Sequence, residues 1–212
     1  MPRLDETNRP ARWAGVPAAD RVAERRALLL DAGLELLGTL GLAGTTVRGV
    51  CAAARLNARY FYESFPDIDA LVVAVFDRVV EELREAGDAA VRAAGTDPVA
   101  RVRALVATTA EFVDTDRRRA RVLYVEGRAH EQLLHRRLES GSLIAGLIAT
   151  ETGGEEPGVA HRVVAAFLVG GFSELLMRWL DGEIPVERDR LVRDTTELFL
   201  ALGRAGARLA NP

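Results

Sequence analysis

The sequence is poor in several features, and each shortage excludes a class of protein. A single cysteine, Cys51, rules out an intrachain disulfide. The longest uncharged apolar run, residues 163–172, is too short to cross a bilayer as a helix. The first twenty residues lack the apolar core of a signal peptide. We therefore expect a cytoplasmic protein with no membrane partner, in which Cys51 is a buried core thiol.

Lysine is absent, so all 28 basic residues are arginine. Any phosphate contact made by a basic side chain therefore uses a guanidinium, which can bind bidentately. Residues 1–66 carry a small positive balance, whereas the rest of the chain is net negative. This asymmetry favours a small nucleic-acid-binding head on an acidic body.

No segment alternates apolar and polar residues as a half-buried strand does, and apolar residues instead recur at helical spacing. The pattern predicts an all-α chain of about nine helices, over residues 21–38, 46–54, 58–64, 67–94, 98–114, 117–125, 128–150, 159–181 and 187–208. Residues 1–20 lack periodicity and are predicted to be a disordered tail, or alternatively a basic arm that reaches DNA. Residues 153–158 read as a polar loop.

Residues that commonly cap helices precede four of these segments. Asp20 is the predicted cap of the first helix, Thr45 of the second, Asn57 of the third and Asp97 of the fifth. In the second helix, apolar residues at i, i+3, i+4 and i+7 form one buried stripe, made of Val47, Val50, Cys51 and Ala54. In the third helix, Phe61 and Phe65 are spaced to anchor it to the core.

The stretch from residue 45 to residue 71 is the most informative, because two short helices joined by the turn 55–57 form a helix-turn-helix pattern. Arg48 lies off the apolar stripe, and the second short helix presents Arg59, Tyr60, Tyr62 and Glu63. An exposed helix that carries arginine and tyrosine suits the major groove of DNA.

We predict that Arg59 reads guanine, because arginine pairs bidentately with O6 and N7; the alternative is a phosphate contact alone or a surface role. Tyr60 is predicted to contact a base edge or a thymine methyl group, and Glu63 either accepts from cytosine N4 or is simply solvated. Thr46 and Asn57 are either helix caps or phosphate contacts. Arg48 either contacts DNA or remains a solvated surface residue.

An amphipathic helix before this motif and a long helix after it give an arrangement that resembles the tetracycline-repressor (TetR) family of transcriptional regulators. The matching residues are Gly41, Thr45-Thr46-Val47, Val50, Ala54, Leu56, Phe61-Tyr62, Phe65 and Leu71. The resemblance implies a DNA-binding domain over residues 21–66 and an effector-binding and dimerisation domain over residues 67–208. It also implies a homodimeric repressor that a small-molecule effector releases from a near-palindromic DNA operator.

The resemblance assigns roles to two residues and fails at two others. Arg48 matches a position that reaches a base or a phosphate. Tyr62 matches the tyrosine that donates to a phosphate, with half-buried packing as the alternative. The turn carries Arg55 where the family commonly has glycine, which predicts strain in a left-handed conformation. The fourth helix starts with Ile68 where the family commonly has lysine, so that phosphate contact is predicted to be missing.

The same resemblance suggests an effector cavity and a dimer face. The candidate cavity residues are aromatic or histidine side chains of the middle helices, each alternatively ordinary core: Phe76, Phe112, Tyr124, His130 and Phe167. The candidate dimer face lies on the last two helices, which alternatively cover only the monomer core: Gly171, Leu175, Trp179, Leu198 and Leu202.

Two other functions compete with the repressor. An all-α enzyme is disfavoured, because the sequence shows no phosphate loop, nucleophile elbow or zinc signature. A helical scaffold whose DNA-binding head has lost its function is kept open by Arg55 and Ile68. His130 and His135 are five residues apart and do not share a helical face, so we expect no metal site and no cofactor.

Overall fold

The computed structural model describes residues 18–127, 131–136 and 158–210. Every regular element in these ranges is helical, which confirms the all-α prediction. In chain order they are α1 (Ala18–Gly44), α2 (Val47–Ala54), α3 (Ala58–Ser64), α4 (Ile68–Ala93), α5 (Pro98–Thr115), α6 (Arg117–Ala120), the π-helix η1 (Arg121–Glu126), α9 (Val159–Leu180) and α10 (Arg188–Ala210). The predicted tail up to residue 17 and most of the predicted helix 128–150 and loop 153–158 lie outside the described residues.

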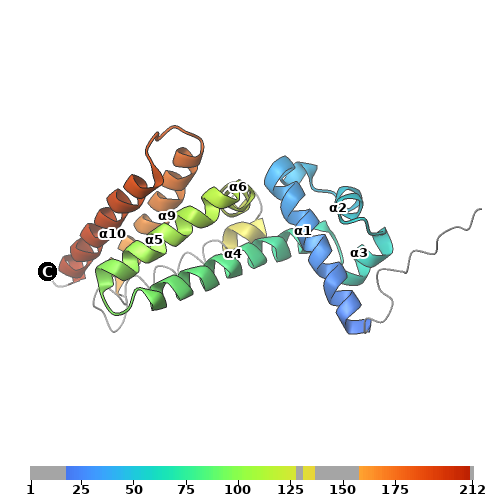
Figure 1. Ribbon diagram of the computed structural model, residues 1–212, viewed down its shortest axis with the longest axis horizontal. Helices are drawn as coiled ribbons and strands as arrows, with labels where there is room; N and C mark the ends of the chain where they lie inside the picture. The colour runs from blue at the N-terminus through green and yellow to red at the C-terminus, as the bar shows by residue number, and fades with distance from the viewer. Residues whose placement is uncertain (1–17, 128–130, 137–157, 211–212) are drawn as a thin grey trace, which may run out of the picture.

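The helices form two groups joined by α4 (Figure 1). In the first group α1, α2 and α3 pack on one another, and we call this group the head. In the second group α10 packs on both α5 and α9, and α6 packs on α5; we call this group, with α4, the body. Because α4 contacts both α1 and α5, it connects the two groups along its length.

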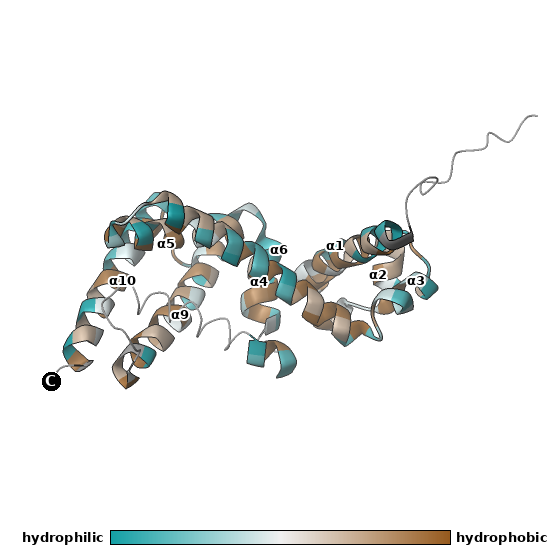
Figure 2. Ribbon diagram, turned by 90° about the horizontal axis from the view of Figure 1, so that it is seen from below, coloured by the Kyte–Doolittle hydropathy of each residue, from teal (hydrophilic) through white to brown (hydrophobic). Residues whose placement is uncertain are grey.

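Each group has its own hydrophobic core, and the helices that surround the cores are amphipathic (Figure 2). The head core buries side chains from four helices, namely Leu29, Leu37, Val50, Phe61, Leu71 and Val75. The body core buries side chains of α5, α9 and α10, namely Val106, Val113, Leu168, Leu176, Leu191 and Phe199. Fully burying one such side chain stabilises the fold by roughly 1.5–3 kcal/mol. Each group therefore has enough apolar contact to hold its helices together.

Two helices, α1 from residue 20 and α9 from residue 162, are long and apolar enough to cross a membrane by length and composition alone. Helices that pack in a protein core can have the same length and composition. In both helices apolar side chains such as Leu37 and Leu176 are completely buried against neighbouring helices. Packing within the chain therefore uses these apolar residues.

The first helix is longer than predicted at both ends. It begins at Ala18, so Asp20 lies inside its first turn and is not its cap. It also continues through Gly38 to Gly44, across a kink at Gly41, where φ is 74°. The predicted cap of α2 is wrong by one residue, because the Thr45 hydroxyl is buried and donates to the Gly41 carbonyl at 2.8 Å.

The cap of α2 is Thr46, whose Oγ1 accepts from the Gly49 N–H at 3.1 Å. The predicted caps Asn57 and Asp97 are confirmed. Cys51 is buried as predicted, and burial raises the pKa of its thiol.

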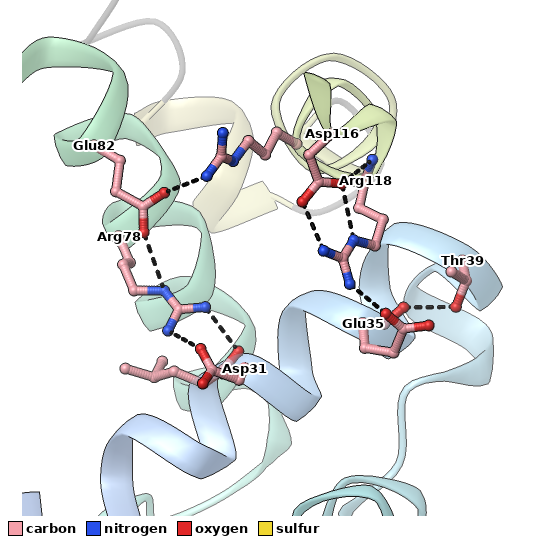
Figure 3. A network of polar contacts seen from close by, with 9 residues as sticks. Asp31, Glu35, Thr39, Arg78, Glu82, Asp116 and Arg118 are labelled. Atoms are coloured by element: carbon pink, nitrogen blue, oxygen red, sulfur yellow. Dashed lines mark hydrogen bonds and ion pairs between the residues drawn. The ribbon is translucent and has the colours of Figure 1, made fainter. Parts of the chain in front are cut away.

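Two arginines of the body hold the outer face of α1 (Figure 3). Arg78 on α4 donates to the Asp31 carboxylate at 2.7 Å. Arg118 on α6 donates to both Glu35 on α1 and Asp116 at the start of its own helix. These contacts fix α1 to α4 and α6, so the head and the body share one polar joint.

A buried carboxylate completes the joint at the kink of α1. Glu126, the last residue of η1, is almost fully buried and accepts from the Leu42 N–H at 3.0 Å. It also accepts from Arg121 Nε at 3.0 Å, and Arg121 donates in turn to the Thr39 carbonyl at 2.9 Å. Because each partner is satisfied, the kinked end of α1 is tied to η1 by charge-assisted hydrogen bonds.

The turn of the helix-turn-helix generates a first prediction. Arg55 has φ 54° and ψ 39°, the left-handed conformation, and no other non-glycine residue among those described has positive φ. Glycine adopts this conformation without the clash of a Cβ atom, although it loses more chain entropy on folding. Arg55→Gly should therefore raise the free energy of unfolding by about 0.5–1 kcal/mol, measured by urea denaturation.

The matched control is Arg103→Gly, because Arg103 is exposed in the interior of α5. There glycine should lower the free energy of unfolding by about 1 kcal/mol. A loss of stability in both variants would contradict the strain assigned to Arg55.

The kink at Gly41 generates a second prediction. A Cβ there would lie 2.8 Å from both Arg121 Nη2 and Glu126 Oε1, whereas a Cβ at Gly95, which also has positive φ, meets nothing within 4 Å. Gly95→Ala should cost about 1 kcal/mol from backbone strain alone. Gly41→Ala should cost about 1–3 kcal/mol more, because it disturbs a buried hydrogen-bonded carboxylate. Equal losses in the two variants, measured by urea denaturation, would contradict this account of the joint.

Candidate nucleic-acid interface

Two sets of contacts hold α3 in place. On its buried face, Phe61 and Phe65 lie in the head core with their ring centroids 5.9 Å apart. From α1, the Arg26 guanidinium lies 4.2 Å from the centroid of the Phe65 ring, and Arg26 Nη1 donates to the Ser64 carbonyl at 3.2 Å. The last turn of α3 is therefore pinned to α1 by a stacked cation and a hydrogen bond.

The opposite side of α3 faces solvent, at the end of the molecule away from α9 and α10 (Figure 1). The Arg59 side chain is 84% exposed and Tyr62 is 59% exposed. Arg48 and Asn57 are also exposed, and Tyr60 is half-buried. Since α2 packs against α3, the structure places the predicted DNA-binding residues on one pair of adjacent helices.

Two of the predicted residues already serve as caps. The Thr46 hydroxyl oxygen accepts from Gly49, and Asn57 Oδ1 accepts from the Tyr60 N–H at 3.2 Å. Each side chain nevertheless keeps a donor, because the threonine hydroxyl has a proton and the asparagine amide has an NH2 group. Both can therefore cap a helix and donate to a phosphate at the same time.

Glu63 has two cationic neighbours. Arg59 Nε donates to Glu63 Oε1 at 3.0 Å, one helical turn away. Arg25 Nη2 on α1 lies 3.6 Å from Glu63 Oε2. The guanidinium of Arg25 also lies 4.4 Å from the centroid of the Tyr60 ring. The carboxylate is thus engaged by arginines of the protein itself, which favours a supporting role over direct contact with cytosine.

The sequence analysis missed Arg25 and Arg26, which support α3 from α1. Their spacing from Leu29 could have identified them. They precede it by four and three residues and therefore lie beside the buried face of α1. Ile68 is partly buried against the head core at the first position of α4. No cationic side chain therefore occupies that position.

The five candidate cavity residues are not brought together. Phe76 is buried in the head core, and Phe112 and Tyr124 are partly buried where they touch both cores. Phe167 is 70% exposed on α9, which does not support its assignment to an internal cavity. His130 lies outside the described residues.

The last two helices leave an apolar face uncovered. Val163, Phe167, Gly170 and Gly171 of α9 are exposed, as is Leu198 of α10. The other predicted dimer residues, Leu175, Trp179 and Leu202, are partly buried against the body core. We call the exposed set of five the open face.

Two of the predicted dimer residues, Gly171 and Leu198, are thus exposed, whereas Phe199 beside Leu198 is buried in the body core. The Phe199 ring makes an edge-to-face contact with Phe172, with ring centroids 5.4 Å apart.

Residues 29–75 match the sequence model of the bacterial regulatory proteins of the tetR family. Among curated proteins, the HTH-type transcriptional regulator BetI of Paraburkholderia xenovorans is 36% identical over 91 residues, which cover 43% of this chain and 47% of that protein. BetI of Burkholderia cenocepacia is 38% identical over 91 residues, covering 43% and 46%. The matched stretch spans about half the length of these curated relatives.

Solved structures resemble the chain over more of its length. A TetR-like transcriptional regulator from Rhodococcus sp. RHA1 has a TM-score of 0.66 at 22% identity and covers 90% of this chain and 98% of its own. The transcriptional regulator FadR from Bacillus subtilis, in complex with stearoyl-CoA, has a TM-score of 0.70 at 14% identity and covers 82% and 97%. At these identities the likeness establishes the fold alone.

Proposed function

We propose that this chain is a transcriptional regulator that represses genes by binding a DNA operator, because residues 29–75 match the bacterial regulatory proteins of the tetR family. The observation that carries the proposal is that α2 and α3, which lie within the matched residues, expose Arg48, Arg59 and Tyr62 to solvent. In the proposal, residues 21–66 bind DNA, and residues 67–208 bind an effector and dimerise. The protein acts in the cytoplasm and has no catalytic activity.

The exposed side chains divide into base readers and phosphate contacts. Arg59 extends from α3 and reads guanine O6 and N7, and Tyr60 beside it contacts a base edge or a thymine methyl group. Tyr62 and Arg48 donate to phosphates, as do Thr46 and Asn57 with the protons that their capping roles leave free. Phosphate contacts set the position of the head on the duplex, and Arg59 and Tyr60 supply the sequence preference.

The open face supports a homodimer. Apolar side chains as exposed as Phe167 and Leu198 are stabilised when a second copy covers them. Gly170 and Gly171 lack side chains that would hold a partner helix away, so α9 and α10 can form a four-helix bundle with their symmetry mates. A two-fold dimer carries two copies of α3 and therefore binds a near-palindromic operator.

A small molecule bound in the body is the proposed signal for release. FadR from Bacillus subtilis, which shares the fold, was solved in complex with stearoyl-CoA. In this chain Phe112 and Tyr124 touch both cores, and η1 joins the body to the kink of α1. A ligand that moves η1 can change the position of the head through Glu126.

A second function remains open, in which the head no longer binds DNA and the chain is a helical scaffold. Two observations favour it: Ile68 occupies the position where a lysine commonly contacts a phosphate, and Arg55 strains the turn. A selection of genomic fragments on purified protein decides between the two. The repressor enriches one near-palindromic sequence, and its affinity falls steeply as salt rises. Enrichment of random fragments, or of none, supports the scaffold.

The division between base readers and phosphate contacts generates a third prediction. Arg59→Ala should weaken binding by about 1–3 kcal/mol and relax the preference at one base position in each half-site. Tyr62→Phe removes only a phosphate donor and should weaken binding to all sequences equally. Affinities for a panel of single-base operator variants test both. Equal losses for Arg59→Ala on every variant would remove its assignment as a base reader.

The open face generates a fourth prediction. Phe167→Glu should convert the dimer into monomers in light scattering, because a carboxylate in a buried interface is strongly disfavoured. The matched control is Val99→Glu, which places the same charge on an exposed apolar residue at the start of α5. The control should remain a dimer. A dimeric Phe167→Glu variant would place the interface elsewhere.

A further inference from the structure

We propose that Arg25 on α1 is a positioning residue that sets the base preference of α3. It acts by orienting Tyr60 and by sharing the carboxylate of Glu63 with Arg59. The inference rests on the proposed function, since Tyr60 and Arg59 are the side chains assigned to the bases. No base contact is assigned to Arg25 itself.

The Arg25 side chain is largely buried. Only 13% of this charged side chain is exposed to solvent. It lies one helical turn before Leu29, which is completely buried in the head core. The backbone of Arg25 is therefore held in place on α1, and its guanidinium extends to α3, where it contacts Tyr60 and Glu63.

The first effect of Arg25 is on Tyr60. A guanidinium 4.4 Å from the ring centroid is attracted to the face of the ring, and the attraction is strongest in one orientation of the ring. The stacked ring is half-buried, so its rotation is restricted before DNA is bound. Arg25 thereby aims the Tyr60 hydroxyl in a set direction, which favours contact with one base edge over others.

The second effect is on Arg59, through Glu63. In the free protein Arg59 donates to Glu63, and it must exchange that bond for a base when DNA binds. Without another cation nearby, the exchange leaves an uncompensated carboxylate facing the phosphates. Arg25 remains 3.6 Å from Glu63 and keeps the carboxylate neutralised while Arg59 turns to the DNA. The cost of releasing Arg59 is thus reduced.

Arg26 supplies a matched control at the next position. It also stacks a guanidinium on an aromatic ring of α3 and donates to the end of that helix. Its ring partner, Phe65, is buried in the head core and is not among the residues assigned to DNA. Loss of Arg26 removes a comparable contact between α1 and α3 without altering a base reader.

The experiment compares Arg25→Ala with Arg26→Ala in a selection from a randomised operator library, with thermal unfolding of both variants. Arg25→Ala should broaden the preference at the base positions that also broaden in Arg59→Ala and Tyr60→Phe. Its affinity for the wild-type operator should fall roughly three- to tenfold, the size expected for one stacked cation and one partly exposed ion pair. Arg26→Ala should lower the melting temperature and leave the pattern of base preferences unchanged.

The double variant Arg25→Ala with Glu63→Gln tests whether Arg25 neutralises the Glu63 carboxylate when Arg59 binds DNA. Removing the carboxylate charge should restore most of the affinity lost in Arg25→Ala, because Arg59 then leaves no uncompensated anion behind. Absence of any restoration overturns the sharing of Glu63. A selection in which Arg25→Ala keeps the wild-type preference, or in which Arg26→Ala broadens it equally, overturns the positioning role. If the wild-type protein enriches no sequence, the proposed function fails and the inference fails with it.

Discussion

Burial of one face of α1 is the constraint on which the rest of the molecule depends. Leu29 and Leu37 have no exposed surface, and they pack in a core that α2, α3 and α4 share. A single helix therefore orients the reading helix and anchors the long helix of the body. Any displacement of α1 relative to α4 must move α3 as well, because the same apolar contacts hold both.

The outer side of α1 shows why a chain without lysine suits this arrangement. Arg78 and Arg118 each hold more than one partner, which a planar guanidinium with five donors does better than an ammonium group. Hydrogen bonds from Arg118 lower the pKa of the Asp116 carboxyl. This contact therefore favours the folded state at neutral pH and weakens as the pH falls through the lowered pKa.

The head and the body meet through apolar packing of α1 on α4 and through the polar contacts of Arg78, Arg118 and Glu126. The polar contacts can change their partners at lower cost than the packed core can be rearranged. The π-helix η1 fits this view, since π-turns interrupt regular helical bonding and are frequent at functional sites. Its buried Glu126 connects the part of the chain proposed to bind an effector with the kink that leads into the helix-turn-helix.

The sequence by itself determined the helices, the motif and the buried stripes, because these follow from spacing along the chain. Val50, Cys51, Phe61 and Phe65 are where periodicity predicts them, and Asn57 and Asp97 cap as local hydrogen bonding requires. Only the tertiary structure decided which outward residues acquire partners. The stacking of Arg25 on Tyr60, the exposure of Phe167 and the burial of Glu126 depend on helices far apart in sequence. Periodicity identifies the buried face of each helix, but it does not encode which other helix will cover that face.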